Sequence, residues 1–306
     1  KTGPNMQPDP HKEAAVVALG MFDGVHIAHR RLMTCARTLA QELGASPVAF
    51  TFQNSPRALF GPAPDAIMLP GEKRETIEGL GLAVDMREFT LRFAKQKPYE
   101  FLGNLMDTYE VKGIITGFNF MFGDHRSGNA DTLRQFGREK GIEVRIIEPV
   151  VYNGAAVSST RVRQAITEGN IREANAMLGA PFFYEGVVAP RKHIGQKLGF
   201  PTANLLPTGK ILPPFGVYAA LAHVEGGCYA AATNIGVRPT VDESSEPVVT
   251  VEPYLLDYAG EPLYGKKLRL EIIDFVRHEV RFPTREALRA QIARDVDTTR
   301  KLLAKP

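Results

Sequence analysis

Two glycine-containing loops lie far apart in the chain, and each opens a different secondary-structure pattern. The first loop, Gly20–His29, reads GMFDGVHIAH; it follows the apolar run Ala14–Leu19 and leads into a helical stretch that begins near His26. The second loop, Gly195–Asn204, reads GQKLGFPTAN and lies among short alternating strands. Because the loops begin in unlike surroundings, we expect two domains of different fold, each with a site of its own.

The first half of the chain alternates short apolar runs with amphipathic helices. The predicted strands are Ala14–Leu19, Val48–Phe52, Val84–Phe89, Val111–Thr116 and Val144–Pro149. The predicted helices are a stripe from Ala28 to Leu43 that ends at Gly44, then Pro98–Tyr109, Asp131–Lys140, Ser159–Glu168 and Ile171–Leu178. Strand and helix in repetition predict an α/β fold with a doubly wound parallel sheet over residues 1–181.

The second half, residues 182–306, shows strands without intervening helices. The predicted strands are Phe183–Ala189, Val217–Val224, Tyr229–Thr233, Val248–Leu256 and Leu268–Val276. Loops rich in proline and glycine separate them, which favours an antiparallel β-barrel. A helix over Thr284–Leu303 is expected to close the barrel, with Thr284 as its N-cap.

Composition indicates an ordinary soluble protein with two domains. Of the 306 residues, 44% are hydrophobic and 23% charged, and the net charge of +3 provides no strong field for nucleic acid or an acidic membrane. The two cysteines, Cys35 and Cys228, lie in different halves, so we expect reduced thiols in a cytoplasm and neither a disulfide nor a cysteine metal site. No apolar run approaches the roughly 20 residues of a membrane span.

The first loop has the chemistry of an anion site. A strand that ends in a glycine turn and enters a helix presents free backbone N–H groups and the positive end of the helix dipole. His26 and His29 are three residues apart, so both imidazoles can face one side of the first turn and donate hydrogen bonds to a polyphosphate. We therefore expect nucleotide binding at Gly20, Phe22, Asp23 and Gly24.

The first loop resembles the HxGH nucleotidyltransferase superfamily, and most closely its FAD synthetase branch, whose usual form is GxFDGxHxGH. Ala28 stands where that pattern has the glycine of its HxGH motif. The resemblance implies a Rossmann-like nucleotidyltransferase domain in which His26 and His29 are catalytic.

Two further segments of the first half are similar to the same branch. VSSTRVR at residues 157–163 resembles ISSTxxR, which implies that Ser158, Ser159 and Thr160 hold phosphates and that Arg163 neutralises the leaving group. GFNFMFG at residues 117–123 is similar to GxDFxFG and implies that Asn119 and Phe120 bind flavin, with Asn119 in place of aspartate. Thr51–Pro56 departs from the usual TFxPxP form.

The second loop resembles the GxxxGFPTAN segment of riboflavin kinases. The resemblance implies a nucleotide site formed by Gly195, Lys197, Gly199, Phe200 and Pro201. Thr202 and Asn204 offer oxygens to Mg²⁺, a hard cation that accepts such ligands together with phosphate oxygens and water.

Further kinase segments follow in the family's order. VEPYLLDY at residues 251–258 resembles ExxLLDF and places Glu252 as the catalytic base. A primary alcohol needs a positioned base to attack a γ-phosphate, so the chemistry agrees. Arg277 and Arg281 lie in a segment similar to RxExxF, which implies flavin binding.

These resemblances cover nearly the whole chain and imply the family of bacterial bifunctional riboflavin kinases/FAD synthetases. ATP, riboflavin and FMN would be the substrates, FAD the product, and Mg²⁺ the cofactor; we expect a monomer or weak homo-oligomer that binds neither nucleic acid nor membrane. Two alternatives stay open. One is a riboflavin kinase whose transferase half has degenerated, given Ala28 and Asn119, and the other is a non-catalytic flavin- or nucleotide-binding regulator.

Overall fold

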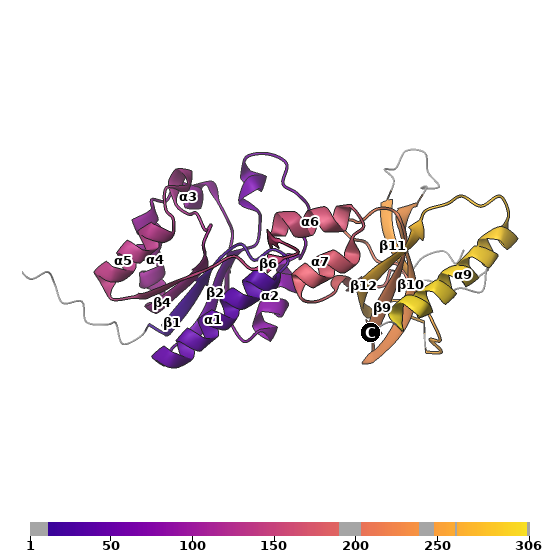
Figure 1. The fold of residues 1–306 in the computed structure, drawn as a ribbon, viewed down its shortest axis with the longest axis horizontal. Helices are drawn as coiled ribbons and strands as arrows, with labels where there is room; N and C mark the ends of the chain where they lie inside the picture. Colours follow the sequence, from indigo (N-terminus) through magenta and orange to yellow (C-terminus); the bar gives the residue numbers. More distant parts are fainter. Residues whose placement is uncertain (1–11, 190–202, 239–247, 261, 305–306) are drawn as a thin grey trace, which may run out of the picture. The chain divides into compact units, whose positions relative to one another are not determined.

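We describe a computed structural model of the chain over residues 12–189, 203–238, 248–260 and 262–304 (Figure 1). The chain divides into two compact units, Lys1–Ser159 and Thr160–Pro306. Among the described residues, no helix is long and apolar enough to cross a membrane.

Unit 1 contains a parallel sheet of five strands in the order β3-β2-β1-β4-β5. The strands are β1 (Ala14–Leu19), β2 (Ser46–Phe52), β3 (Ala83–Arg87), β4 (Glu110–Gly117) and β5 (Glu143–Ile147). All five strands were predicted from the apolar runs, and the doubly wound parallel fold is confirmed.

Five helices connect these strands: α1 (Ile27–Leu43), α2 (Pro70–Gly79), α3 (Leu91–Ala94), α4 (Pro98–Thr108) and α5 (Ala130–Lys140). Two 3₁₀ turns, η1 (Pro56–Leu59) and η2 (Asp124–Arg126), lie between them. Helix α1 ends at Gly44 in the left-handed conformation (φ 61°), as the sequence predicts. Helices α2 and α3 were not predicted, because α3 is one turn long and α2 has charged side chains on its buried face.

Helices cover both faces of the sheet in unit 1 (Figure 1). Helix α1 lies on one face, where Gly113 of β4 leaves space for Leu39 of α1 beside Val16 of β1. Helices α4 and α5 contribute Leu102 and Phe136 to the core on the other face. The chain reverses its direction across the sheet between β1 and β4, so the carboxyl ends of these two strands form the switch point at which such sheets bind ligands.

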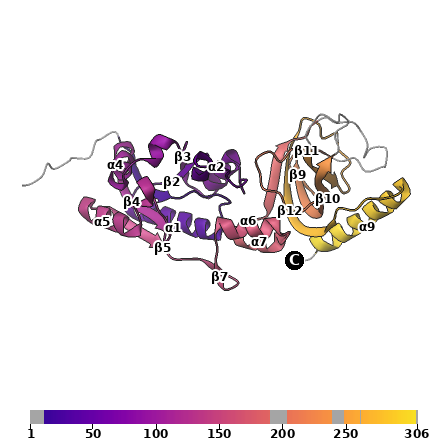
Figure 2. The same ribbon diagram turned by 90° about the horizontal axis from the view of Figure 1, so that it is seen from above.

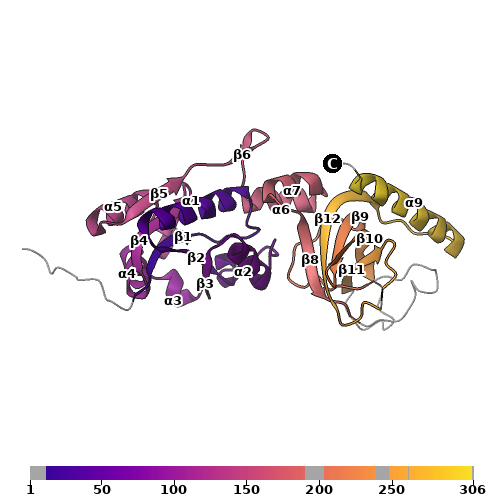
Figure 3. The same cartoon turned by 90° about the horizontal axis from the view of Figure 1, so that it is seen from below.

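A small hairpin and two helices follow the parallel sheet. Strands β6 (Val151–Tyr152) and β7 (Ala155–Ala156) form the hairpin that stands out from the ribbon in Figure 3. Helices α6 (Ser159–Thr167) and α7 (Ile171–Leu178) come next.

Helix α7 belongs to unit 2 by its contacts, so the compact units divide before the expected boundary at residue 181. The side-chain amide of Asn175 donates to the carbonyl of Ile272 (2.9 Å) and accepts from the backbone N–H of Phe182 (2.7 Å). Arg172 also donates to Asp274, at 2.7 Å. These bonds attach α7 to the sheet that follows it.

Unit 2 contains an antiparallel sheet of five strands in the order β11-β10-β9-β12-β8. The strands are β8 (Phe182–Val187), β9 (Gly216–Val224), β10 (Gly227–Arg238), β11 (Val248–Leu255) and β12 (Lys267–His278). The segment around Asn204 links the two edges of the sheet: Leu205 pairs with Val251 of β11, and Ala189, just after β8, donates to the carbonyl of Asn204 at 3.2 Å. The antiparallel architecture is confirmed.

Helix α9 (Arg285–Leu303) packs against β9, β10 and β12 (Figure 2). Thr284 caps it as predicted, because its hydroxyl accepts a hydrogen bond from the backbone N–H of Ala287 at 3.1 Å. The fully buried side chains of α9 are polar ones, Asp295 and Thr299. The helix is therefore held partly by a polar contact, which the sequence did not reveal.

Candidate functional site

Loop 20–26, which connects β1 to α1, has an unusual backbone. Phe22, Gly24 and Val25 have positive φ angles of 51°, 81° and 39°. A residue other than glycine in this region costs about 1–3 kcal/mol, so the surroundings must hold the loop in place. The Phe22 ring is fully buried, and a Cβ atom on Gly20 would clash with it. Glycine is therefore required at position 20.

Side chains from neighbouring elements hold the main chain of loop 20–26. The hydroxyl of Thr51, near the end of β2, donates to the carbonyl of Met21 at 3.0 Å. The guanidinium of Arg30 on α1 donates to the carbonyl of Val25 at 3.1 Å. Both ends of the loop are thus fixed by contacts to regular structure.

Asp23 connects the loop to two distant segments. Its carboxylate accepts hydrogen bonds from the backbone N–H groups of Ile67 and Met68, both at 3.1 Å. Its carbonyl accepts a hydrogen bond from the hydroxyl of Ser159 at 2.9 Å. Two segments predicted to hold phosphates, the first loop and the Ser158–Ser159 pair, therefore adjoin each other.

The two histidines of the first loop lie together, as their spacing predicts. His26 is the N-cap of α1, and its Nδ1 accepts a hydrogen bond from the backbone N–H of His29 at 3.4 Å. The two rings are stacked with centroids 3.5 Å apart, and the ring of Phe22 meets that of His29 edge-on at 5.2 Å. The Nδ1 atom of His29 is buried and has no hydrogen-bond partner among the described residues.

Burial keeps both imidazoles neutral. It lowers the pKa of His26 to about 4. It also lowers the pKa of His29 well below the usual 6.5, and the nearby His26 and Lys73 lower it further. Because Nδ1 of His26 is an acceptor, the proton of this neutral ring belongs on Nε2, from which it can be donated to a phosphate oxygen.

Lys73 is a buried cation beside the loop that the sequence analysis missed. It lies on α2, is 5% exposed, and its Nζ donates to the carbonyls of Met21 (3.1 Å) and Phe52 (2.5 Å). Burial lowers its pKa to about 8, while the charge of Asp23 opposes the shift. The sequence shows only that Lys73 comes three residues after Pro70, which begins α2, and this pattern does not indicate a buried lysine.

The segment after β4 carries the predicted flavin-binding residues of unit 1. Asn119 lies in the turn that follows β4 and is exposed. Phe120 is half-buried and its ring stacks on that of Phe122, with centroids 5.6 Å apart. This turn lies at the carboxyl end of β4, next to β1, and so at the switch point with loop 20–26.

Thr160 and Arg163 belong to unit 2 by the division of contacts, although the sequence analysis assigned them to the first site. Both lie on α6, where Thr160 is exposed and Arg163 is half-buried. Their predicted contacts with phosphate stay predictions.

In unit 2, three polar residues form a row across neighbouring strands. Leu205 and Val251 exchange backbone hydrogen bonds of 2.9 and 3.0 Å, so Asn204 lies opposite Glu252. Glu252 in turn lies opposite Asn234 of β10. Residues directly opposite each other in an antiparallel pair project from the same face, with Cβ atoms about 4.5–5.5 Å apart.

Two details make this row a candidate reaction site. Asn204 is 5% exposed, and its Oδ1 has no hydrogen-bond partner among the described residues. The hydroxyl of Thr250, on the same face of β11, donates to Oε1 of Glu252 at 2.8 Å. An amide oxygen and an oriented carboxylate therefore adjoin each other.

The predicted flavin-binding arginines of unit 2 have different surroundings. The guanidinium of Arg277 donates to both carboxylate oxygens of Asp295, with distances from 2.7 to 3.0 Å, and Gln291 donates to the same carboxylate at 2.8 Å. Arg281 is exposed after β12. The hydrogen bonds of Arg277 to Asp295 therefore connect β12 to α9.

Several predicted nucleotide and metal ligands lie outside the described residues. They are Gly195, Lys197, Gly199, Phe200, Pro201 and Thr202.

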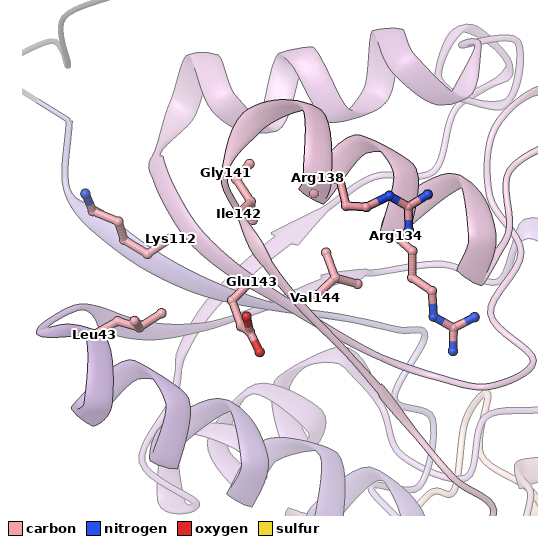
Figure 4. Close-up of a pocket in the computed structure, with 9 residues that line it drawn as sticks. Leu43, Lys112, Arg134, Arg138, Gly141, Ile142, Glu143 and Val144 are labelled. Carbon is pink, nitrogen blue, oxygen red and sulfur yellow. The ribbon is translucent and has the colours of Figure 1, made fainter.

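An open hollow of about 680 Å³ in unit 1 lies away from these residues (Figure 4). It is lined by Leu43, Lys112, Arg138 and Glu143, among others, and so lies where α5 ends and β5 begins. The hollow thus lies at the amino end of β5. Ligands of doubly wound sheets bind at the opposite, carboxyl ends of the strands. We therefore assign no role in the reaction to this hollow.

Comparisons with protein families divide the chain in the same order as the sites. Residues 9–161 match the FAD synthetase family and residues 178–303 match the riboflavin kinase family.

Individual relatives match both parts at once. Bifunctional riboflavin kinase/FMN adenylyltransferases are similar over nearly their whole length: that of Listeria monocytogenes is 31% identical, over 95% of this chain and 93% of that protein. The corresponding proteins of Pseudomonas fluorescens and Escherichia coli are 34% and 32% identical, each over 96% of this chain and 95% of the relative. A crystal structure of a macrolide-efflux protein from Streptococcus pneumoniae superposes with a TM-score of 0.85 at 29% identity and covers 95% of both chains.

Proposed function

The chain belongs to the bifunctional riboflavin kinase/FMN adenylyltransferase family, and we propose that its second part phosphorylates riboflavin while its first part adenylylates the resulting FMN. We assign the two activities to residues 182–306 and 1–181, respectively. The observation that carries the proposal is the pair of distinct polar sites: two stacked neutral imidazoles on a strained loop, and a carboxylate beside a buried amide on a β-sheet.

In the adenylyl transfer, a phosphate oxygen of FMN bonds to the α-phosphorus of ATP, and the bond from that phosphorus to the bridging oxygen of the β-phosphate breaks, so pyrophosphate leaves. The attacking oxygen is already anionic, so no general base is required. Neutral His26 and His29 donate hydrogen bonds to phosphate oxygens as these gain charge. Neighbouring hydroxyls and Arg163 support this role.

The remaining ligands of this first site follow from their positions around the loop and the switch point. We propose nucleotide contacts from Gly20, Phe22, Asp23, Gly24, Ser158, Ser159 and Thr160, and flavin contacts from Asn119 and Phe120.

In the kinase reaction, the ribityl 5′-hydroxyl oxygen bonds to the γ-phosphorus of ATP, ADP leaves, and the hydroxyl proton goes to Glu252. The hydrogen bond from Thr250 orients the carboxylate for this transfer. Arg277 and Arg281 are proposed to contact the flavin. The proposed contacts to the nucleotide come from Gly195, Lys197, Gly199, Phe200 and Pro201.

The residues around Asn204 fit Mg²⁺. The orphaned amide oxygen of Asn204 is a hard donor in a buried position, and Glu252 lies opposite it on β11. We propose that Asn204 and Thr202 hold the ion, which would neutralise charge on the ATP phosphates. The proposal includes a monomer or weak homo-oligomer in the cytoplasm that uses small molecules rather than nucleic acid. The net charge of +3 provides no strong field for nucleic acid, and the two cysteines in different halves favour reduced thiols.

One assay tests the proposal against both alternatives. The protein is incubated with riboflavin, ATP and Mg²⁺, and the fluorescent flavins are separated by chromatography. We expect both FMN and FAD. FMN alone would indicate a degenerate adenylyltransferase, and the absence of both products would indicate a binding protein without turnover.

A further inference from the structure

A buried lysine links the ends of two neighbouring strands beneath the adenylyltransferase loop. Nζ of Lys73 donates to the carbonyl of Met21, in the loop after β1, and to that of Phe52, the last residue of β2. Strands β1 and β2 are hydrogen-bonded neighbours, so the ammonium lies between their carboxyl ends.

The ionisable groups that interact with Lys73 include Asp23 in loop 20–26 and His29 on α1, the helix that follows this loop. The carboxylate of Asp23 favours its charged form, and its own positive charge disfavours protonation of His29. On its own helix, the adjacent Glu72 accepts a hydrogen bond from the backbone N–H of Leu69 at 2.8 Å. The position therefore requires a hydrogen-bond donor, since an apolar side chain of the same length would leave the carbonyls of Met21 and Phe52 without the donor that Lys73 supplies.

We propose that Lys73 is a positioning residue for FMN adenylylation, which holds loop 20–26 in the conformation that presents His26 and His29 to the phosphates. The inference rests on the proposed function. The strained φ angles of Phe22 and Val25 explain why such a contact is needed, because residues in this region persist only where surrounding groups hold them. Lys73 acts through the loop and not on the substrate, since its Nζ donates to two main-chain carbonyls beneath the loop and the side chain is almost fully buried.

The first test compares two lysine variants of the full-length protein. Lys73→Met removes the contact, and Lys12→Met is the matched control, because Lys12 also donates to a main-chain carbonyl of unit 1, that of Met106 at 3.0 Å. We expect Lys73→Met to lower kcat for FMN adenylylation by about 10²-fold, with a much smaller change in the KM for ATP, since misplaced groups lose transition-state contacts first. Lys12→Met should keep the parental kcat.

Riboflavin phosphorylation in the same preparation reports whether the rest of the protein is intact. We expect it to be unchanged in both variants. A parental adenylylation kcat in Lys73→Met would overturn the inference. If the parental protein itself made no FAD from FMN and ATP, the proposed function would fail, and Lys73 would not be the cause.

A second measurement distinguishes positioning from a merely structural role. The ring of His29 is followed by NMR as the pH is lowered; besides burial, the charges of His26 and Lys73 lower its pKa. Loss of the lysine charge should raise the titration midpoint of His29 in Lys73→Met, whereas Lys73→Arg should keep the parental midpoint. An unchanged midpoint in Lys73→Met would show that the lysine does not act on this site.

Lys73→Arg also carries the test if the methionine variant does not fold. The longer, planar guanidinium retains the charge but changes the geometry of both hydrogen bonds. We expect about a tenfold lower kcat for adenylylation with riboflavin phosphorylation intact. A parental kcat in this variant, beside an unfolded Lys73→Met, would mean that Lys73 serves folding alone.

Discussion

The two proposed sites of this chain differ in the protonation state that their proposed reactions need. In unit 1, burial makes the two imidazoles neutral hydrogen-bond donors, and no carboxylate serves as base in the proposed reaction. In unit 2, Glu252 is half-buried on a strand and receives a hydrogen bond from Thr250. The difference follows from the nucleophile, because the FMN phosphate is already anionic whereas the riboflavin hydroxyl must lose a proton.

The two sites also differ in how they are held. Loop 20–26 is strained and depends on side chains from β2, α1 and α2. The row of Asn204, Glu252 and Asn234 depends on backbone pairing, which any sequence with the same register could supply. Unit 1 should therefore respond to substitutions outside its site, and unit 2 mainly to substitutions within the row.

The largest effect is expected from Glu252→Gln, which should impair the activity of one half only. Riboflavin phosphorylation should fall by about 10²–10⁴-fold because general-base assistance is lost. FMN adenylylation should stay near the parental rate. The control is Glu185→Gln, which alters a carboxylate paired with Lys267 on β12 and should leave both activities near the parental rate. Flavin chromatography with riboflavin or FMN as substrate measures both. Near-parental FMN formation in Glu252→Gln would show that another group is the base.

The converse variant is His29→Ala. FAD formation from FMN should fall by about 10²–10³-fold, as is typical when one donor to a developing negative charge is lost. Riboflavin phosphorylation should persist. His125→Ala is the control, because that imidazole is exposed and lies beside Asp124. A joint loss of both activities in His29→Ala would point to misfolding or to one shared site.

A stability difference between the units is expected from Asp295→Ala. This carboxylate is buried and accepts from Arg277 and Gln291, so its removal leaves the guanidinium of Arg277 without its partner and should destabilise unit 2 by about 3 kcal/mol. Heat inactivation should reach the kinase at lower temperature and leave the adenylyltransferase unchanged. The exposed Asp297 on the same helix gives the control Asp297→Ala. Equal heat resistance of the two variants would mean that the ion pair does not hold α9.

Truncation tests whether unit 2 works alone. Fragments 160–306 and 182–306 should both phosphorylate riboflavin, since the strands and α9 are present in each. The longer one should be more stable by about 1–3 kcal/mol, because it keeps the hydrogen bonds of Asn175 to Ile272 and Phe182. Urea unfolding measures the difference. A folded but inactive longer fragment would show that the kinase borrows residues from the first 159.

The last effect is a pH dependence of stability that arises from His26 in unit 1. His26 has a pKa of about 4 in the folded chain against an ordinary 6.5, so the unfolded chain binds more protons between these values. Stability should therefore be complete above pH 6.5 and decline as the pH falls toward 4, by at most about 1.4 kcal/mol per pH unit for one histidine. Denaturation of the parental protein and of His26→Gln at pH 7 and pH 5 measures this. An equal pH slope in both would exclude His26 as the source.

Much of the fold could be predicted because local patterns specify it. The apolar run Ala14–Leu19 is a strand with those bounds, and Gly44 ends α1 in the left-handed conformation. Helix α2 could not be predicted in the same way, because Glu72 and Lys73 are buried there and periodicity counts charged residues as exposed. The link between α7 and β12 was also missed, since no local pattern shows which sheet a helix joins.

The sequence by itself determined the architecture of both halves, because glycine turns and strand periodicity are local properties. The type of chemistry in each half was implied by the resemblance of its motifs to known families. Only the tertiary structure decided the surroundings of the side chains. It buries His26 and His29 and so makes them neutral, brings Lys73 beneath the loop, and assigns Arg277 to Asp295. These features depend on burial or on contacts between residues that are distant in the chain. A short stretch of sequence determines neither of them.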